Sequence, residues 1–292
     1  MMFLSSLFNK HHVVLKKGQD LHIVWTLLWN QVLVLKLRLY KWLHGIHHPV
    51  IHYYAMCWNE EKMLPFMFDY YERFVDKFII YDNFSTDDSE VIINSHRNTE
   101  IKKFNTDGKL NDIIHLDIKN NCWKQSRGKA DYVIVCDIDE FFYHPEIETC
   151  LKQMRQHGWT ITRPQGFEMY SEQFPKYDNK RGITEIVRMG VASFWYNKSI
   201  LFDPHRIVEV NYDPGCHTCH PVGCVYFSDD KEIKLLHYKN LGVDTMIKRY
   251  RECADRLSEI NIKNGYGLQY LSKEEEIKSK FYNNLIASSQ VI

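Results

Sequence analysis

The sequence has no surplus of charge of either sign. Its 292 residues include 37 Lys and Arg and 37 Asp and Glu, so the formal net charge is zero with neutral histidines. Domains that bind nucleic acid usually carry a basic surplus, which attracts the phosphate backbone. The even balance therefore favours other partners, and we predict no nucleic acid among them.

The sequence also lacks an apolar run long enough to cross a membrane, and it lacks internal repeats. The longest apolar stretch, residues 23–37, is interrupted by Asn30, Gln31 and Lys36, whereas a transmembrane helix needs about 20 predominantly apolar residues. The apolar start of the chain is shorter than a signal-peptide core and has no basic region before it. We predict a cytoplasmic location, with peripheral attachment to the inner face of a membrane as an open alternative.

The eight cysteines are too scattered for a small secreted disulfide scaffold. Residues 216–220 (Cys-His-Thr-Cys-His) fit the pattern of covalent haem attachment. A tetrahedral zinc site is also conceivable there, formed by Cys216, Cys219, Cys224 and His220. A non-enzymatic metal- or haem-binding module around Cys216–Cys224 is therefore one alternative function.

The first 48 residues are more basic than the rest of the chain. Residues 10–41 contain six Lys or Arg and a single acid, Asp20. The aromatic residues suited to a lipid headgroup region are Trp25, Trp29 and Trp42. Apolar residues at 32–37 fit neither a helical nor a strand period. We predict an extension over residues 1–48, with peripheral membrane contact and packing on the main domain both left open.

Strands and helices alternate from about residue 50. Ile51–Cys57 and Lys77–Tyr81 are predicted strands, and Tyr132–Cys136 is an unbroken apolar run expected of a central strand covered on both faces. The alternation predicts an α/β fold with a mixed, mostly parallel sheet and helices on both faces. Ser85 is predicted to cap the helix after the second strand.

Beyond Pro145, residues 158–236 contain many turn residues and short apolar runs, which indicates hairpins on an acceptor side. Asp244–Ile260 predicts a long helix. We predict a main domain over residues 49–265 and a charged helical tail over residues 266–292.

Polar residues follow the three predicted strands. Asn59 and Glu60 follow the first, Asp82 the second, and Asp137 and Asp139 the central one. Because the carboxyl ends of parallel strands face one crevice, these side chains are predicted to meet there. An acid after a buried strand can accept hydrogen bonds from a nucleobase or ribose. The Asp-x-Asp pair offers hard oxygen ligands to Mn²⁺ or Mg²⁺, which would also bind a diphosphate.

Three segments together resemble the N-terminal landmarks of family-2-type glycosyltransferases: Ala-Met-Cys-Trp-Asn-Glu at 55–60, Tyr-Asp-Asn-Phe-Ser-Thr-Asp at 81–87 and Cys-Asp-Ile-Asp-Glu-Phe at 136–141. The likeness is closest to the branch found in bacterial and viral surface-glycan synthesis and runs from about Ile51 to Tyr250. It implies a GT-A, Rossmann-like nucleotide-binding fold, a divalent metal and a nucleotide-sugar donor. It also implies a glycan or lipid-linked, lipopolysaccharide-type acceptor, with inverting transfer preferred.

The resemblance assigns roles to individual residues. Those implied to bind the nucleoside are Asn59, Glu60 and Asp82. Asp137 is implied to lie near the ribose and the metal, and Asp139 to be a metal ligand. Phe84 stands where the family commonly has a small residue, so the contacts of the second segment are left open.

Two later segments, residues 166–175 and 236–239, also resemble that branch. His237 matches a late histidine that completes the metal site, with a structural strand-end histidine as the alternative. Lys239 is predicted to face the diphosphate, or else to be an exposed structural lysine. Arg127 and Lys129 are further candidates for phosphate.

The catalytic base is a carboxylate that takes a proton from the acceptor hydroxyl. Glu168 and Glu172 lie in the region predicted to line the acceptor side, with Glu168 preferred and Asp213 left open. The acid–Asp pair usual in the family is missing from this stretch. Residues 214–217 resemble a Pro-Gly-Cys-His turn of the branch, which predicts His217 in an acceptor-binding loop.

A nucleotidyltransferase is the alternative within enzymes, because it too uses paired aspartates and a metal. Such an enzyme normally carries a Gly-rich, basic phosphate loop near its start, and Asn59-Glu60 stands in that place here. Metal-dependent sugar transfer is therefore the leading hypothesis.

Overall fold

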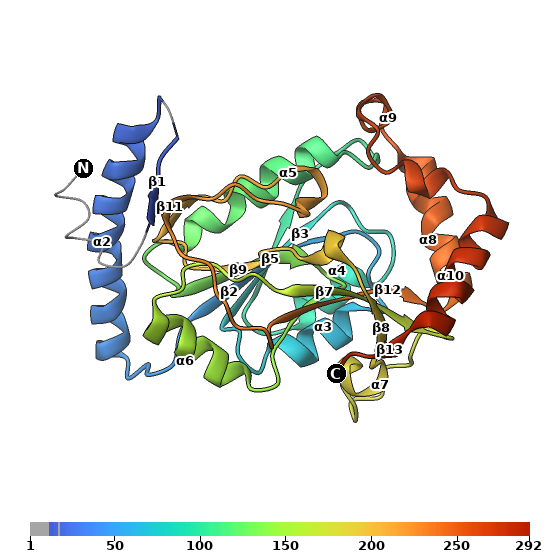
Figure 1. The fold of residues 1–292 in the computed structure, drawn as a ribbon, viewed down its shortest axis with the longest axis horizontal. Coiled ribbons are helices and arrows are strands. Elements are labelled where there is room, and N and C mark those ends of the chain that lie inside the picture. Colours follow the sequence, from blue (N-terminus) through green and yellow to red (C-terminus); the bar gives the residue numbers. More distant parts are fainter. Residues whose placement is uncertain (1–11, 17) are drawn as a thin grey trace.

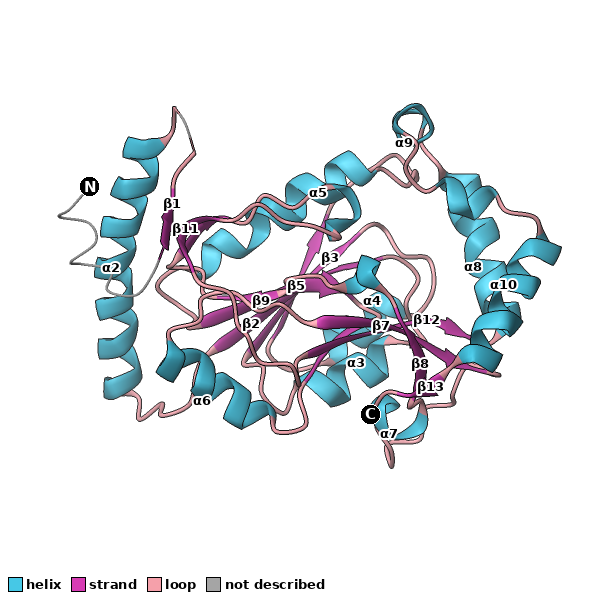
Figure 2. Ribbon diagram, viewed as in Figure 1, coloured by secondary structure: helices cyan, strands magenta, loops and turns pink. Residues whose placement is uncertain are grey.

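The computed structural model describes residues 12–16 and 18–292, and its strands form two five-stranded sheets and one three-stranded sheet (Figures 1 and 2). The strands are β1 (His12–Val14), β2 (Ile51–Cys57), β3 (Lys77–Asp82), β4 (Thr99–Lys103), β5 (Tyr132–Asp137), β6 (Glu140–Tyr143), β7 (Gln165–Ser171), β8 (Met189–Ala192), β9 (Leu201–Phe202), β10 (Ile207–Glu209), β11 (Val222–Val225), β12 (Lys234–Leu241) and β13 (Ser289–Gln290). The α-helices are α2 (Asp20–Leu43), α3 (Leu64–Tyr71), α4 (Ser89–Ser95), α5 (Asp112–Asn121), α6 (Ile147–His157), α7 (Ile183–Ile186), α8 (Val243–Arg256), α9 (Glu259–Asn264) and α10 (Glu274–Ala287). The 3₁₀ helices are η1 (Cys122–Ser126), η2 (Phe194–Tyr196), η3 (Pro214–Cys216) and η4 (Leu268–Leu271).

The first five-stranded sheet has the order β4-β3-β2-β5-β9, in which β9 alone runs antiparallel to its neighbour. Every residue of β2 is buried, because α3 covers one face of the sheet while α5 and η1 cover the other (Figure 2). On one side the ring of Tyr53 lies against that of Tyr71 of α3, with centroids 4.6 Å apart, and on the other Tyr54 shares an apolar cluster with Trp123 of η1. The predicted mixed α/β fold with a mostly parallel sheet and helices on both faces is confirmed.

The second five-stranded sheet has the order β13-β8-β7-β12-β6. Strand β12 is parallel to β7 and antiparallel to β6. A two-residue turn, Ile138-Asp139, joins β5 of the first sheet to β6 of the second. The Asp-x-Asp segment therefore lies at the junction of the two sheets.

Helix α2 packs on the three-stranded sheet β1-β11-β10. Ile23 and Leu27 are buried with Val208 and Val222 in one apolar cluster. The Lys41 ammonium also lies 2.5 Å from the Asp131 carboxylate. The predicted packing of the N-terminal segment on the main domain is therefore observed for α2. Within residues 12–16 and 18–292, no helix is both long and apolar enough to span a membrane.

Two local predictions are wrong. Helix α4 begins at Ser89, not after Ser85, because the Ser85 hydroxyl donates to Asp82 Oδ1 (2.5 Å) and accepts from the Asn59 N–H (2.9 Å). The helix predicted over Asp244–Ile260 is confirmed over Val243–Arg256, and only its predicted end at Ile260 is wrong. The predicted strands Ile51–Cys57, Lys77–Tyr81 and Tyr132–Cys136 are confirmed within a residue. The domain boundaries after residues 48 and 265 stay predictions.

Candidate functional site

The loops after β2 and β3 are joined side by side. The Thr86 N–H donates to Asn59 Oδ1 at 2.8 Å, and the Glu60 N–H donates to the Ser89 hydroxyl at 2.8 Å. Asn59 and Phe84 both have a φ of 53°, a left-handed conformation that is costly for a bulky residue. The side chain of Phe84 is exposed to solvent. The ends of β2 and β3, two of the three strand ends predicted to meet, are therefore in contact.

The carboxylates of Asp82 and Glu60 already have protein partners. Asp82 is fully buried and accepts from the Ser85 N–H and hydroxyl and from Lys103 Nζ at 2.7 Å. Arg249 of α8 donates to Glu60 Oε1, and its other terminal nitrogen donates to the Trp58 carbonyl at 3.0 Å. The roles of Asp82 and Glu60 in nucleoside binding stay predictions.

Asp137 lies between two buried lysines. Its Oδ1 accepts from Lys119 Nζ of α5 at 2.6 Å, while its N–H donates to Glu140 at 3.1 Å. Glu140 in turn lies 2.5 Å from Lys198 Nζ, and these two side chains are 1% and 4% exposed. Burial opposes ionisation of Asp137, but Lys119 and then Lys198 hold the pKa of this carboxyl below its ordinary value. Because the Asp137 side chain remains 38% exposed, its free side is open to a ligand.

Asp139 and His237 form the centre of the site. Asp139 Oδ2 lies 3.3 Å from His237 Nε2, and the Tyr196 ring stacks on the imidazole with centroids 4.2 Å apart. Burial opposes ionisation of Asp139, but the imidazole lowers the pKa of this carboxyl below its ordinary value. His237 Nδ1 is buried and has no hydrogen-bond partner among the described residues.

Asp139 and His237 could supply two of the ligands of a divalent cation. Two ligands at adjacent corners of an octahedral Mg²⁺ site lie about 3 Å apart, given ligand distances of about 2.1 Å. The oxygen and nitrogen of Asp139 and His237 match that spacing. Among the described residues, Asp137 does not complete a set of three closely spaced ligand atoms with them, and its Oδ1 is bound by Lys119 Nζ at 2.6 Å.

Lys239 is a partly buried cation without a carboxylate. Its ammonium lies 5.3 Å from the ring centre of Tyr250 and 4.8 Å from that of Tyr270, whose hydroxyl is 3.4 Å away. Among the described residues it forms no ion pair. It follows His237 by two positions on β12, where the register with β7 shifts between His237 and Asn240. Burial opposes ionisation of Asp139, and after the imidazole the Lys239 charge also lowers the pKa of this carboxyl, so the ammonium lies near the centre of the site. A cation in this setting favours an anionic ligand.

Glu168 lies beside His237, since the two residues are directly paired across β7 and β12. Its carboxylate accepts from the Tyr170 hydroxyl at 2.9 Å. Glu172 is exposed in the bend after β7. The structure therefore brings Glu168 to the centre of the site through strand pairing, whereas Glu172 follows the strand.

The loop from Asp213 to His220 contacts the site from another side. His217 Nδ1 donates to the Trp195 carbonyl at 2.6 Å, and burial followed by the nearby Lys198 charge lowers the pKa of His217. Asp213 instead binds the Thr218 hydroxyl and His220. His217 thus adjoins η2, which carries the exposed rings of Phe194 and Trp195.

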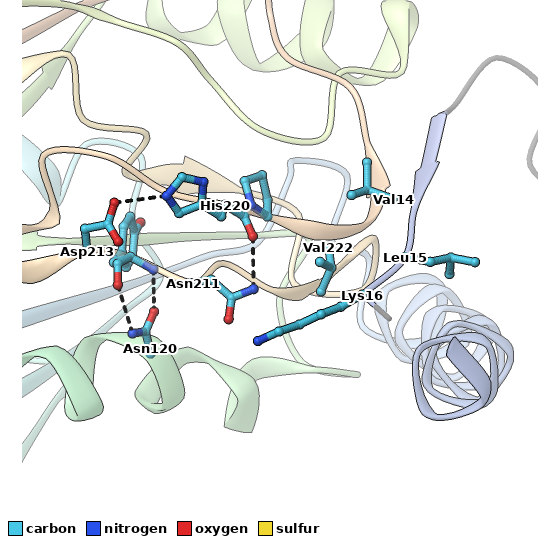
Figure 3. Close-up of a pocket in the computed structure, with 10 residues that line it drawn as sticks. Val14, Leu15, Lys16, Asn120, Asn211, Asp213, His220 and Val222 are labelled. Atoms are coloured by element: carbon cyan, nitrogen blue, oxygen red, sulfur yellow. Dashed lines mark hydrogen bonds and ion pairs between the residues drawn. The ribbon is translucent and has the colours of Figure 1, made fainter. Parts of the chain in front are cut away.

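A cavity of about 530 Å³ lies between β1, the end of α5 and this loop (Figure 3). Asn120 of α5 pairs with the backbone of Tyr212, and Asp213 with His220, along its wall. The cavity is not lined by Asp137, Asp139 or His237. It is a feature separate from the strand-end site.

The zinc site suggested for Cys216, Cys219, Cys224 and His220 is not assembled in the described part of the chain, whereas the haem alternative stays a prediction. The one set of three His, Cys, Asp or Glu ligand atoms within 4.8 Å of one another is His144, Cys150 and Asp230. In it, His144 Nδ1 accepts from the Glu146 N–H at 2.9 Å. A neutral ring then carries its proton on Nε2, toward Asp230, which leaves no free nitrogen for a metal. Cys216 and Cys224 belong to different apolar clusters.

Sequence reasoning missed several charged residues at the site: Lys119, Glu140, Lys198 and Arg249. Glu140 directly follows the Asp-x-Asp segment. The other three do not belong to any motif that follows a predicted strand. Arg127, suggested for phosphate, instead donates to the carbonyls of Pro204 and Val208.

Comparisons with known proteins give only distant likeness. No family model matches the chain, and no curated protein matches it. Among solved structures, it is similar to S. aureus TarS 1-349, at 11% identity and a TM-score of 0.40 over 82% of this chain and 72% of that one. The structure of TarS 1-349 in complex with UDP is 11% identical, with a TM-score of 0.41 over 80% of this chain and 71% of that one. The structure in complex with UDP-GlcNAc is 12% identical, with a TM-score of 0.41 over 82% of this chain and 73% of that one. At these values the likeness carries no argument for function, which rests on the site itself.

Proposed function

We propose that the protein transfers a sugar from a nucleotide-sugar donor to a glycan or lipid-linked acceptor, with a divalent metal. One observation carries the proposal: Asp139 lies 3.3 Å from His237 of β12, and two residues further along this strand is Lys239, a cation that has no carboxylate partner among the described residues. A diphosphate with its metal supplies the charges that these groups lack.

Each group has a role in this proposal. Asp139 and His237 would hold Mn²⁺ or Mg²⁺, with the free side of Asp137 facing metal and ribose. The metal, when bound, stabilises charge on the departing nucleoside diphosphate. Lys239 binds the diphosphate directly. The residues proposed to hold the nucleoside are Asn59, Glu60 and Asp82.

The acceptor side completes the proposed reaction. Glu168 takes the proton from the acceptor hydroxyl, with Glu172 as the alternative base, and transfer is inverting. His217 and the exposed Phe194 and Trp195 contact the acceptor, since aromatic faces suit sugar rings. A lipopolysaccharide-type acceptor belongs to the same proposal, whereas contact of residues 1–48 with a membrane stays a separate prediction.

Nucleoside diphosphates and nucleotide sugars are expected to raise the Tm of the protein when Mn²⁺ is present. A ligand at 100 times its Kd stabilises the folded state by about 2.7 kcal/mol. Lys239→Met should lose most of this shift for diphosphates, because its ammonium no longer meets the phosphate charge. Lys248→Met, on the exposed side of α8, is the matched control and should keep the shift. A panel in which no nucleotide raises the Tm contradicts the proposed function.

Asp82→Ala should raise the donor KM several-fold without changing the concentration of Mn²⁺ required. Its carboxylate holds Ser85 and Lys103, so its loss disturbs the loop that pairs with Asn59 rather than the metal centre. Steady-state kinetics at varied donor and varied Mn²⁺ separate the two effects. A folded variant with unaltered donor KM would show that Asp82 only shapes the turn before Ser85.

A further inference from the structure

Helix α2 is apolar on two opposite faces. The inner face, with Ile23 and Leu27, is packed on the body of the protein. The opposite face is exposed, although a surface helix normally turns a polar face to solvent. The apolar residues of this face are spaced alternately four and three residues apart in the sequence, and this spacing aligns them in one stripe along the helix. This outer stripe consists of Leu21, Trp25, Leu28, Val32, Leu35, Leu39 and Trp42.

The outer stripe is rich in tryptophan and bordered by cations. Trp25 and Trp42 are 70% and 76% exposed, and Trp29 beside the stripe is also exposed. Lys36 and Arg38 are exposed and form no ion pair with any residue that the structure describes. The only acid in α2 is Asp20, in its first turn. The surface therefore combines apolar area, indole rings and positive charge.

We propose that the outer stripe of α2 binds the surface of an anionic lipid bilayer, with the helix lying in the headgroup region. Indole rings favour this region. Lys and Arg can lay their apolar stems along the surface and keep their charges among the phosphates. Cations near an anionic membrane strengthen binding by about fivefold each at low salt.

The charges beside the stripe favour lipid over a second copy of this chain. If two copies formed a parallel coiled coil on the stripe, the flanking positions would contain Trp29, Lys36 and Leu43 on one side and Val24, Gln31 and Arg38 on the other. These positions include cations but no acid, so no attractive charge pair would form between the copies. An anionic surface meets the same cations favourably.

The helix is held so that the whole stripe faces outward. Figure 1 shows α2 along one end of the molecule, opposite α8 and α10. Besides its apolar inner face, Asn30 Nδ2 donates to the His205 carbonyl at 2.8 Å, and Lys41 pairs with Asp131. The stripe is thus a preformed surface, and membrane binding requires no unfolding of α2.

Co-sedimentation of the full chain with vesicles tests the proposal. The protein should bind vesicles of phosphatidylcholine mixed with phosphatidylglycerol more tightly than vesicles of phosphatidylcholine alone. Binding to the mixed vesicles should weaken in high salt, because screening shortens the range of the charges from about 10 Å at 0.1 M to about 3 Å at 1 M. No binding to mixed vesicles at low salt overturns the proposal.

Matched variants assign the binding surface. Trp25→Ser/Trp29→Ser/Trp42→Ser should reduce vesicle affinity at least about tenfold, given the apolar area withdrawn from the lipid. Lys36→Glu/Arg38→Glu should reduce it mainly at low salt. The control, Tyr282→Ser/Ile286→Ser, changes exposed apolar residues of α10 and should bind like the unaltered protein. Circular dichroism confirms that each variant is folded.

Two results would overturn the proposal. Equal loss of binding in the α2 and α10 variants would mean that the surface is not specific to the outer stripe. Light scattering that shows a dimer, converted to a monomer by the tryptophan variant with unchanged vesicle binding, would assign the stripe to a second copy of the chain. Neither result bears on sugar transfer, because vesicle binding is measured without donor or metal.

Discussion

Asp139→Asn should abolish the metal-dependent part of donor binding while the protein stays folded. The substitution preserves side-chain size and one carbonyl oxygen, but it removes the charge that faces His237 at 3.3 Å. Hard divalent cations depend on charged oxygen ligands. Loss of groups that only orient a metal ligand already costs about 10–100-fold in affinity, so loss of a ligand's charge should cost at least about 100-fold. Calorimetric titration of a nucleoside diphosphate with and without Mn²⁺ measures the difference.

The control for this experiment is Asp117→Asn. Asp117 is an exposed acid on α5, the helix that carries Lys119, so the variant changes the net charge equally without touching Asp139. It should keep its Mn²⁺-dependent binding. Metal-dependent binding retained by Asp139→Asn would exclude Asp139 as a ligand.

The strands that support the site could be predicted because their sequence allows few alternatives. Tyr132–Cys136 has no polar residue to place on a solvated face, which is typical of a strand covered on both faces. Parallel neighbours then bring their carboxyl ends to one edge. The contact of Asn59 with Ser85 and Thr86, which joins the two loops, follows from this topology.

The ion pairs of the site could not be predicted, because their partners are far apart in the sequence. Lys119 is 18 residues from Asp137, Lys198 is 58 from Glu140, and Arg249 is 189 from Glu60. No periodicity connects such positions. They meet because α5, α8 and the segment that follows η2 bring these side chains to the ends of β2 and β5.

The N-terminal helix was obscured for a different physical reason. An amphipathic helix is recognised because its apolar residues gather on one side. In α2 the inner face and the outer stripe are both apolar, as Leu27 and Leu35 illustrate, so the two patterns overlap along the sequence. The outer stripe of α2, which made the helical period hard to recognise in the sequence, is also the surface that we propose to bind lipid.

Lys198→Met should lower the free energy of unfolding by about 3–5 kcal/mol, because breaking a buried ion pair leaves an uncompensated charge. The Lys198 ammonium lies 2.5 Å from Glu140, and both side chains are almost completely buried. Burial disfavours the charged form of Lys198, yet Glu140 and then Asp137 hold its pKa above the ordinary value, as expected of a compensated pair. Urea denaturation followed by circular dichroism measures the loss.

A double substitution shows whether the unpaired carboxylate is the cause. Glu140→Gln/Lys198→Met removes both charges and leaves an amide that can still accept from the Asp137 N–H, the bond that Glu140 makes at 3.1 Å. It should recover most of the stability lost in Lys198→Met, since replacing a whole buried pair is often nearly neutral. Lys248→Met, an exposed lysine of α8, should change stability by less than about 0.5 kcal/mol. If the double variant is as unstable as Lys198→Met, the aliphatic packing of Lys198, and not its charge, supports the junction of the two sheets.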